Sequence, residues 1–203
     1  VRFPSWIDDD DQLTSVNLDV GFRPGQAYTI RVAAGLTDVL GQRLALAHAE
    51  RIEFGDLWPL ARIGLGSGVF EASGKREFAI AHINTTDLEI GTVKLGEEQI
   101  FALEAGLGYD KTRELPGFSA TNVKQGRRNV RALEKRDIGA ILGGDKARGA
   151  FAVTLRYTSE GRTRHERSIG QLTNLGISAK LSKRGSLVWI TELSTGKPVP
   201  DAD

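Results

Sequence analysis

LTNLGISAKLSKRGSLVWITELSTGKPVPDAD, residues 172–203, is the stretch that decides the fold class. Leu175, Ile177 and Ala179 alternate with small or polar residues, and this period of two is typical of a strand with one buried face. Residues 183–191 favour a turn followed by a second strand, because the run after Gly185 is almost entirely β-branched or aromatic. A polar turn and the start of a third extended piece follow. Since such strands cannot close a core alone, we expect them to open a further domain of a longer chain.

The rest of the chain repeats this pattern of short extended runs separated by turns. Before residue 58, the strands that alternation predicts cover residues 16–20, 28–32 and 51–54. Residues 57–60 mark a boundary, because Pro59 follows a strand and precedes a glycine-rich segment. After this boundary, the predicted strands cover residues 69–72, 78–82, 88–93, 136–142 and 149–157.

Three segments between these strands are predicted to be something else. Residues 96–107 favour a short helix, because Glu97 and Glu98 would lie in its first turn. Residues 108–126 show no period and predict a long loop, and residues 161–171 are polar and predict a linker. The expected organisation is a partial β module at 1–58, a complete β domain at 59–160, a linker at 161–171 and the first strands of another domain at 172–203.

Composition excludes several functional classes. The chain has 203 residues, with 27 basic and 26 acidic side chains, so no net charge favours nucleic acid or an anionic membrane as partner. There is no cysteine, which excludes disulfides and thiolate chemistry within this chain. No run of about 18 apolar residues occurs, so we expect no membrane span in this segment. The chain also lacks methionine, and we expect it to begin either inside a gene product or after processing.

Three stretches resemble bacterial alpha-2-macroglobulins. PGQAYTIRVAAGLTDVLGQRL, residues 24–44, is similar to the end of an Ig-like module of that family. PLARIGLGSGVFEASGKREFAIAHINTTDLEIGTVKL, residues 59–95, looks like the start of a macroglobulin domain. Residues 172–203 look like the entry to another such domain. The matching residues there are Thr173, Leu175, Gly176, Ser178, Lys180, Val188, Trp189, Leu193, Thr195, Gly196, Lys197, Pro198, Val199 and Ala202.

The resemblance implies an all-β chain of tandem β-sandwich domains of the macroglobulin, Ig-like or fibronectin-III-like kind. It implies a non-catalytic structural segment of a broad-spectrum inhibitor that traps host or competitor proteases after they cleave a bait region. The implied partners are neighbouring macroglobulin domains of the parent chain, target proteases and a peptidoglycan-synthesis protein. The implied location is the periplasm, with the parent an inner-membrane lipoprotein. Many members carry a Cys-x-Glu-Gln thioester, which cannot lie within this cysteine-free chain, and whether the parent has one stays open.

A different functional class competes with this interpretation. An Ig-like adhesion or carbohydrate-binding module of a bacterial surface protein would have a similar strand pattern. An exposed aromatic platform formed by Trp6, Trp58 or Trp189 would favour such a module. Burial of Trp189 in a hairpin core would favour the macroglobulin interpretation.

Two charged clusters are candidate binding sites. Asp8, Asp9, Asp10 and Asp11 are adjacent, whereas a calcium loop needs spaced ligands and a glycine, so a solvated acidic loop is favoured. The basic cluster consists of Lys124, Arg127, Arg128, Arg131, Lys135 and Arg136. On a helix most of these cations would share a face that could contact phosphates, but no aromatic residue lies among them to stack on bases. A solvated face or an interdomain contact is therefore favoured.

Glycine-rich and histidine-containing segments also fail as active sites. Residues 64–68 and 143–146 lack the spacing of phosphate-binding loops and are predicted to be turns. His48, His82 and His165 lie far apart, without the spacing of metal ligands. No serine lies in a nucleophile-elbow context. The sequence therefore predicts no catalytic, cofactor-binding or metal-binding residue, and no enzyme.

Overall fold

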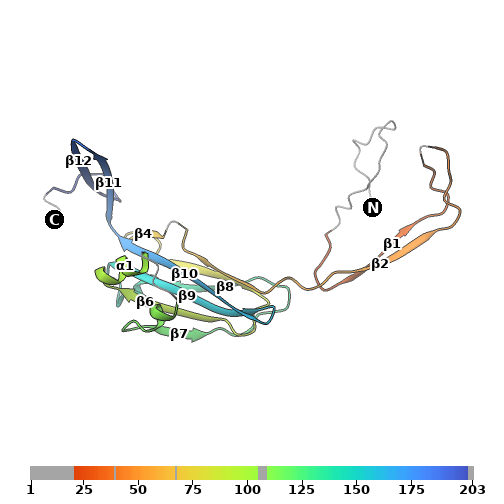
Figure 1. Cartoon of the computed structure of the whole chain (residues 1–203), viewed down its shortest axis with the longest axis horizontal. Helices are drawn as coiled ribbons and strands as arrows, with labels where there is room; N and C mark the ends of the chain where they lie inside the picture. Colours follow the sequence, from red (N-terminus) through yellow and green to blue (C-terminus); the bar gives the residue numbers. More distant parts are fainter. Residues whose placement is uncertain (1–20, 39, 67, 105–108, 201–203) are drawn as a thin grey trace. The chain divides into compact units, whose positions relative to one another are not determined.

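The computed structural model describes residues 21–38, 40–66, 68–104 and 109–200, and these form two separate units (Figure 1). The N-terminal unit is Val1–Leu57 and the C-terminal unit is Trp58–Asp203. The predicted strand at 16–20 and the acidic residues Asp8–Asp11 lie outside the described residues.

The described part of the N-terminal unit, residues 21–38 and 40–57, contains an antiparallel hairpin. Strand β1 (Ala27–Val32) pairs with β2 (His48–Glu53). Alternate residues of β1 are half-buried, as the period of two predicts. At the open end of the hairpin, the rings of Phe22, Tyr28 and Phe54 form a cluster with centroids 4.9–5.8 Å apart.

The C-terminal unit contains a β-sandwich. One sheet has the order β4-β10-β9-β6-β7, and the other has the order β3-β5-β8. The strands of the first sheet are β4 (Val69–Glu71), β6 (Glu89–Leu95), β7 (Ser119–Asn122), β9 (Gly149–Ser159) and β10 (Arg162–Thr173). The strands of the second are β3 (Leu60–Gly64), β5 (Glu77–Ile83) and β8 (Ala132–Asp137). All these pairings are antiparallel except that of β4 with β10. The all-β sandwich class predicted from the sequence is confirmed.

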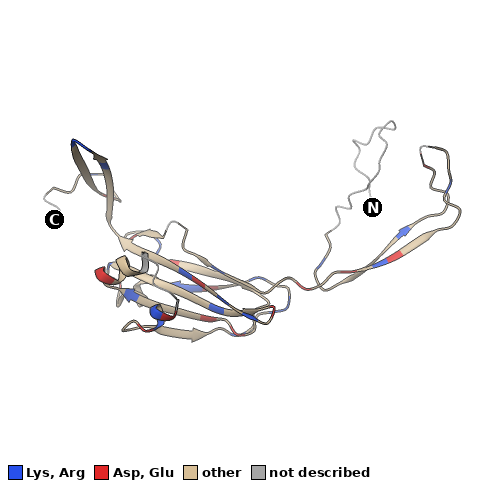
Figure 2. Ribbon diagram, viewed as in Figure 1, with Lys and Arg blue, Asp and Glu red and all other residues tan. Residues whose placement is uncertain are grey.

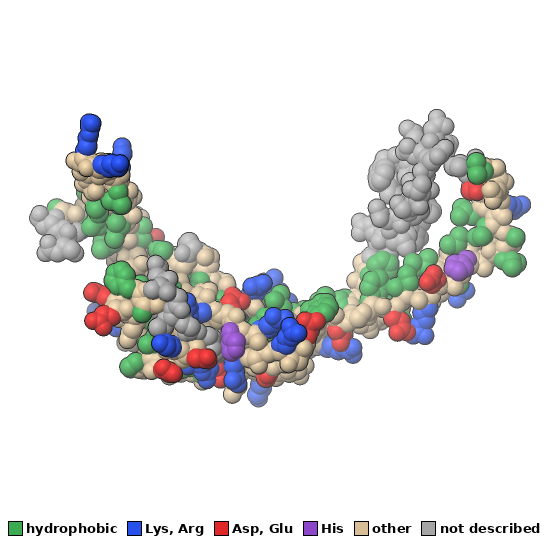
Figure 3. Space-filling view, in the orientation of Figure 1, with side chains coloured by type: hydrophobic (Ala, Val, Ile, Leu, Met, Phe, Trp, Pro, Cys, Tyr) green, Lys and Arg blue, Asp and Glu red, His purple; other side chains and the backbone are tan. Residues whose placement is uncertain are grey.

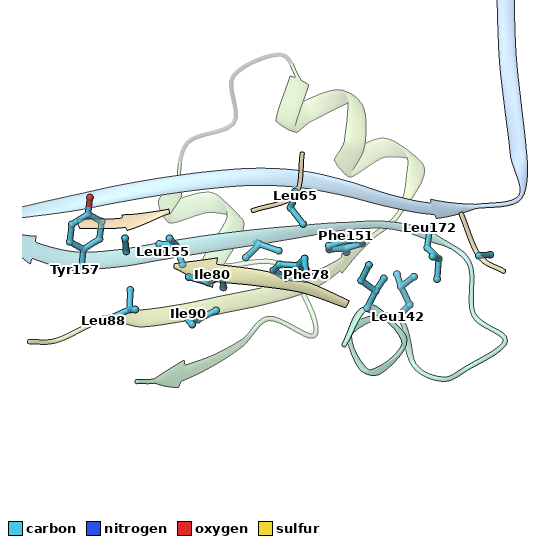
Figure 4. Packing of buried hydrophobic residues seen from close by; sticks show 14 residues of the cluster. Leu65, Phe78, Ile80, Leu88, Ile90, Leu142, Phe151, Leu155, Tyr157 and Leu172 are labelled. Atoms are coloured by element: carbon cyan, nitrogen blue, oxygen red, sulfur yellow. The ribbon is translucent and has the colours of Figure 1, made fainter. Parts of the chain in front are cut away.

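The core lies between the two sheets and centres on Phe151 of β9 (Figure 4). The Phe151 ring is fully buried, 6.0 Å from the ring of Phe78 and 6.3 Å from that of Phe70. Gly170 of β10 lies opposite Phe151, and a Cβ at this glycine would come within 2.3 Å of the ring. The absent side chain of Gly170 therefore makes room for the ring of Phe151.

A helical layer covers part of the other face of the five-stranded sheet. It consists of α1 (Glu97–Glu104), α2 (Tyr109–Arg113) and the segment that leads into β7. Ile100, Leu115 and Phe118 pack against a second buried cluster, formed by Val93, Leu95, Ala150 and Ala152. Both faces of this sheet are therefore apolar over part of their area.

Three predictions of local structure are wrong. The predicted linker at 161–171 forms most of β10. The first half of this strand is polar and exposed and shows no apolar alternation, but residues 162–172 all pair with β9. The predicted loop at 108–126 contains α2 and β7. The predicted strand at 136–142 is the end of β8 followed by α3 (Ile138–Leu142), because a short apolar run cannot be assigned by its period alone.

A short hairpin follows the sandwich in the chain. Strand β11 (Leu175–Ser182) pairs with β12 (Gly185–Glu192), as the alternation predicted. The expected third extended piece makes an isolated bridge between Thr191 and Pro198.

Asp87 ties the loop before β6 to β9 and provides a test of stability against pH. Its carboxylate accepts hydrogen bonds from the Thr158 hydroxyl (2.7 Å) and the Thr158 N–H (3.0 Å), which lower the pKa of Asp87. A carboxyl whose pKa is lower in the folded state contributes stability that is present above its unfolded pKa, about 4, and is lost as the pH falls below it. We expect Asp87→Asn to reduce the loss of stability between pH 5 and pH 2 in urea titrations. Equal losses in the variant and the parent would contradict this role.

Candidate interaction surfaces

The positions that the sequence singled out as possible active sites do not come together. Gly143 and Gly144 end α3, and both their N–H groups donate to the Gly139 carbonyl oxygen. Gly68 lies in a turn against β10, where a Cβ would come within 2.7 Å of the Ile169 carbonyl oxygen. These glycines therefore serve turns, a cap and close packing.

The three histidines occupy three different environments. His48 lies on β2 of the N-terminal unit, and His165 lies on β10. His82 is buried on β5, with its Nδ1 atom 3.1 Å from the Thr85 hydroxyl oxygen. Over the residues that the structure describes, no group of three or more His, Cys, Asp or Glu side chains could hold a metal ion.

The tryptophans do not form a stacking platform within the described part of the chain. Trp58 is 67% exposed and Trp189 is 51% exposed, whereas Trp6 lies outside the described residues. No ring contact among the described residues involves Trp58 or Trp189. Trp189 is thus neither buried in a hairpin core nor part of an aromatic surface.

The hairpin β11–β12 exposes several apolar side chains (Figure 3). The cross-strand pairs Ile177–Ile190 and Ala179–Val188 lie on the same face, because they are two positions apart along the ladder. Ile177 is 68% exposed and Val188 is also exposed. This hairpin therefore buries little of its own apolar surface.

The basic cluster is extended and not helical. Residues 124–136, here called the basic segment, comprise a loop and most of β8 (Figure 2). The loop is fixed by Asn129, whose N–H donates to Asn84 Oδ1 (2.7 Å) and whose Oδ1 accepts from Asn84 Nδ2 (2.9 Å). The helical face considered from the sequence is therefore wrong, and the cations lie along a loop and a sheet edge.

Strand β8 is an edge strand, and its register determines which backbone groups face outward. The Ile138 N–H donates to the Arg76 carbonyl oxygen (2.8 Å), which extends the β5–β8 register by one pair. Hydrogen-bonded and non-hydrogen-bonded pairs alternate along an antiparallel ladder. Leu133, Lys135 and Asp137 therefore direct their N–H and C=O groups away from β5.

The opposite edge of the same sheet is closed by a side chain from the other sheet. The Ile63 N–H of β3 donates to Glu166 Oε1 of β10 (3.0 Å). Arg62 Nη1 lies 3.6 Å from the second oxygen of Glu166. The three-stranded sheet thus has one edge capped by a carboxylate. Its other edge, β8, carries two cations and two carboxylates and follows a loop with four further cations.

Several charged side chains at the β8 edge form ion pairs with side chains of opposite charge. Lys75 Nζ and Lys135 Nζ lie 2.9 and 3.1 Å from the same Glu77 oxygen, and these hydrogen bonds lower the pKa of Glu77. Arg136 Nη1 lies 3.5 Å from Glu134 and donates to the Lys135 carbonyl oxygen (2.9 Å). Lys75 and Lys135 share the Glu77 carboxylate, and Asp137 adds a further carboxylate at the end of β8. The excess of positive charge therefore lies in the loop before β8 and not on the strand itself.

The chain is similar in sequence to two alpha-2-macroglobulins. No protein-family model matches the chain. It is 24% identical over 203 residues to an alpha-2-macroglobulin homolog of Nostoc sp., covering 97% of this chain and 10% of that protein. It is 21% identical over 194 residues to an alpha-2-macroglobulin of Xylella fastidiosa, covering 87% of this chain and 12% of that protein. Over most of its length, this chain is similar to bacterial alpha-2-macroglobulins.

A solved structure supports the same likeness at the level of the fold. Native alpha-2-macroglobulin from Escherichia coli, in a crystal structure spanning its domains MG0, NIE and MG1, has a TM-score of 0.56 and 12% identity. The match covers 88% of this chain and 60% of that one. The chain spans only about a tenth of the length of the curated alpha-2-macroglobulins that it matches.

No helix within the described ranges is long and apolar enough to cross a bilayer.

Proposed function

We propose that this chain is a non-catalytic structural segment of a longer bacterial alpha-2-macroglobulin that traps proteases. The similarity to two alpha-2-macroglobulins over 97% and 87% of the chain carries the proposal. The division into two β units is compatible with a tandem array of domains. Each unit would be a building block of the array, and the chemistry of trapping would belong to the whole protein.

The construction of the sandwich supports the proposed physical role. Its buried aromatic and aliphatic core fixes the two sheets against each other, so the domain is expected to move as one body. In an array of such bodies, cleavage of one exposed segment can release a rearrangement of the others. The proposed task of this segment is to transmit that rearrangement without unfolding.

The partners and the location are proposals of the same kind. We place the parent in the periplasm as an inner-membrane lipoprotein. Neighbouring macroglobulin domains, target proteases and a peptidoglycan-synthesis protein are its proposed partners. The assignment of residues 1–58, 59–160 and 172–203 to separate modules of the parent also stays a prediction, with the end of the second module moved because β10 extends the sandwich to Thr173.

Protease trapping by the full-length parent tests the proposal. After incubation with a protease, the protease should elute with the parent in size-exclusion chromatography and lose activity on large substrates but keep it on a small peptide. The isolated 203-residue chain is the matched control, and we expect it neither to retain nor to inhibit the protease. Inhibition by the isolated chain, or free protease after incubation with the parent, would overturn the proposal.

Methylamine treatment separates two forms of the same mechanism. A thioester in the parent reacts with methylamine, which would appear as an increase in intact mass and a loss of covalent protease capture. A parent without a thioester should show no mass change and should still retain the protease non-covalently.

The alternative function is adhesion or carbohydrate binding. The exposed indole of Trp58 is the observation that favours it. Quenching of tryptophan fluorescence by bacterial polysaccharides, lost in Trp58→Ala, would support this alternative. Unchanged fluorescence across a polysaccharide series would remove it.

A further inference from the structure

We infer that the open edge of β8 is a docking site for an extended acidic segment of a partner protein, which pairs as an additional strand beside residues 133–137. This inference goes beyond the proposed function and does not depend on it. Addition of a peptide strand to a sheet edge is a common mode of recognition, in which backbone hydrogen bonds give affinity and alternate side chains give specificity.

Backbone geometry provides the first argument. Leu133, Lys135 and Asp137 direct their N–H and C=O groups outward, and within the described chain no strand pairs with this edge. The Lys135 carbonyl oxygen accepts from Arg136, and Asp137 caps α3 through its side chain. The Leu133 N–H and C=O and the Lys135 N–H can therefore receive the backbone of a new strand.

Comparison of the edges provides the second argument. Within the two sheets of the sandwich, the edge strands are β3, β4, β7 and β8. The edge strands β4 and β7 have only 3 and 4 residues, and β3 is capped by Glu166. Strand β8 has 6 residues and is the longest of the four. It is therefore the edge most able to hold an incoming strand.

Charge provides the third argument and defines the ligand. The basic segment contains six cations and one carboxylate, in a chain whose formal net charge is only +1. Residues 133–137 themselves carry two cations and two carboxylates, so the excess of positive charge comes from the four cations of the adjoining loop, Lys124, Arg127, Arg128 and Arg131. Lys135 lies on the outer face of β8, and Arg136 lies on the inner face, so acidic residues of an added strand would meet a cation on either face. Charge complementarity thus favours an acidic partner.

One exposed apolar side chain defines the pattern further. Leu133 is 60% exposed and lies on the same face as Lys135, two residues away. An added strand would place an apolar residue beside Leu133 and an acidic residue beside Lys135. The fitting ligand is therefore a short extended run in which acidic and β-branched residues are interspersed.

Nucleic acid fits this surface less well. No aromatic residue occurs between Lys124 and Arg136, so bases have no platform on which to stack. A phosphate backbone would also leave the outward C=O of Leu133 without the N–H donor that a peptide strand provides, because phosphodiester oxygens only accept hydrogen bonds.

The proposal is tested with the 203-residue chain and a fluorescein-labelled seven-residue peptide, capped at both ends, that intersperses glutamate with valine and threonine. Binding is measured by fluorescence anisotropy. Leu133→Pro removes the outward N–H, and proline is tolerated at such a position because β5 does not use that N–H. Leu133→Ala is the matched control, because it removes the side chain but keeps the N–H. Lys135→Glu tests the charge.

We expect Leu133→Pro to weaken binding about tenfold relative to Leu133→Ala, through loss of a backbone hydrogen bond and strand geometry. Lys135→Glu should weaken it by about tenfold, and more so at low salt. On binding, the amides of Leu133 and Lys135 should become protected from hydrogen exchange, whereas those of Glu134 and Arg136 are already bonded to β5. Far-UV circular dichroism checks that each variant remains folded.

Three outcomes would overturn the proposal. Absence of binding would mean that the cations only prevent strand addition at this edge. Equal binding by Leu133→Pro and Leu133→Ala, with loss in Lys135→Glu, would mean a charge contact without strand pairing. Displacement of the peptide by an equal concentration of a single-stranded oligonucleotide would mean that the surface binds polyanions in general.

Discussion

Replacing Phe151 by alanine is expected to lower the free energy of unfolding of the sandwich by about 3–5 kcal/mol. The Phe151 ring is fully buried between the two sheets and contacts the rings of Phe70 and Phe78. Its removal loses the burial of a large side chain and leaves a cavity that the long ladder of β9 and β10 cannot close. Urea titration followed by circular dichroism measures the effect.

Phe101→Ala is the matched control, because Phe101 of α1 is 75% exposed. It should change the free energy of unfolding by less than about 0.5 kcal/mol. Comparable losses in the two variants would show that the core is not centred on Phe151.

The second large effect is expected at Gly170. A Cβ at this position would lie 2.3 Å from Phe151 Cζ and 2.8 and 2.9 Å from its Cε atoms. The ring is enclosed and cannot turn away, so Gly170→Ala should destabilise the sandwich by about 1–3 kcal/mol. Gly126→Ala is the control, because a Cβ there would meet only Ala132 at 3.5 Å, an ordinary contact.

The two positions should also be coupled. In the double variant Phe151→Ala, Gly170→Ala, the new methyl group enters space that the ring has left. The combined loss should therefore be smaller than the sum of the single losses, by about 0.5 kcal/mol or more. Additive losses would mean that the two side chains do not share this space.

Most strands could be predicted because their apolar residues alternate or cluster within a few neighbouring positions of the sequence. β5, β9 and β12 alternate or concentrate apolar residues over seven or more positions. The helix α1 could also be predicted, since Glu97 and Glu98 lie in its first turn. A further signal was missed there: the Gly96 N–H donates to Gln99 Oε1, a capping interaction three residues apart.

The remaining elements depend on contacts between distant residues. β10 is a strand because β9 pairs with it, although its first half is polar and exposed. α3 begins because Asp137 accepts a hydrogen bond from the Gly139 N–H, which ends β8 within an apolar run. Neither the pairing of β10 with β9 nor the capping of α3 by Asp137 can be recognised from the local periodicity of the sequence.

The same reasoning explains what was missed at the β8 edge. The sequence identified six nearby cations but placed them on a possible helix. The position of Lys135 and Arg136 on a sheet edge follows from the pairing of β8 with β5, in which Ala132 lies opposite His82, 50 positions earlier in the chain. Which backbone groups face outward is a property of that register, and composition contains no information about it.

The turn between β9 and β10 has a consequence for the order in which the chain folds. Its two central residues, Glu160 and Gly161, both have positive φ (53° and 70°), as in the tight type I′ turns that join twisted strands. Closing so short a loop costs little conformational entropy, and hairpins of this kind form in about 1–10 μs. The β9–β10 ribbon is therefore expected to form first and to act as the template on which β6 and the distant second sheet assemble. Pulse-labelling hydrogen exchange should show early protection in β9 and β10 and later protection in β5 and β8, and the reverse order would exclude such a template.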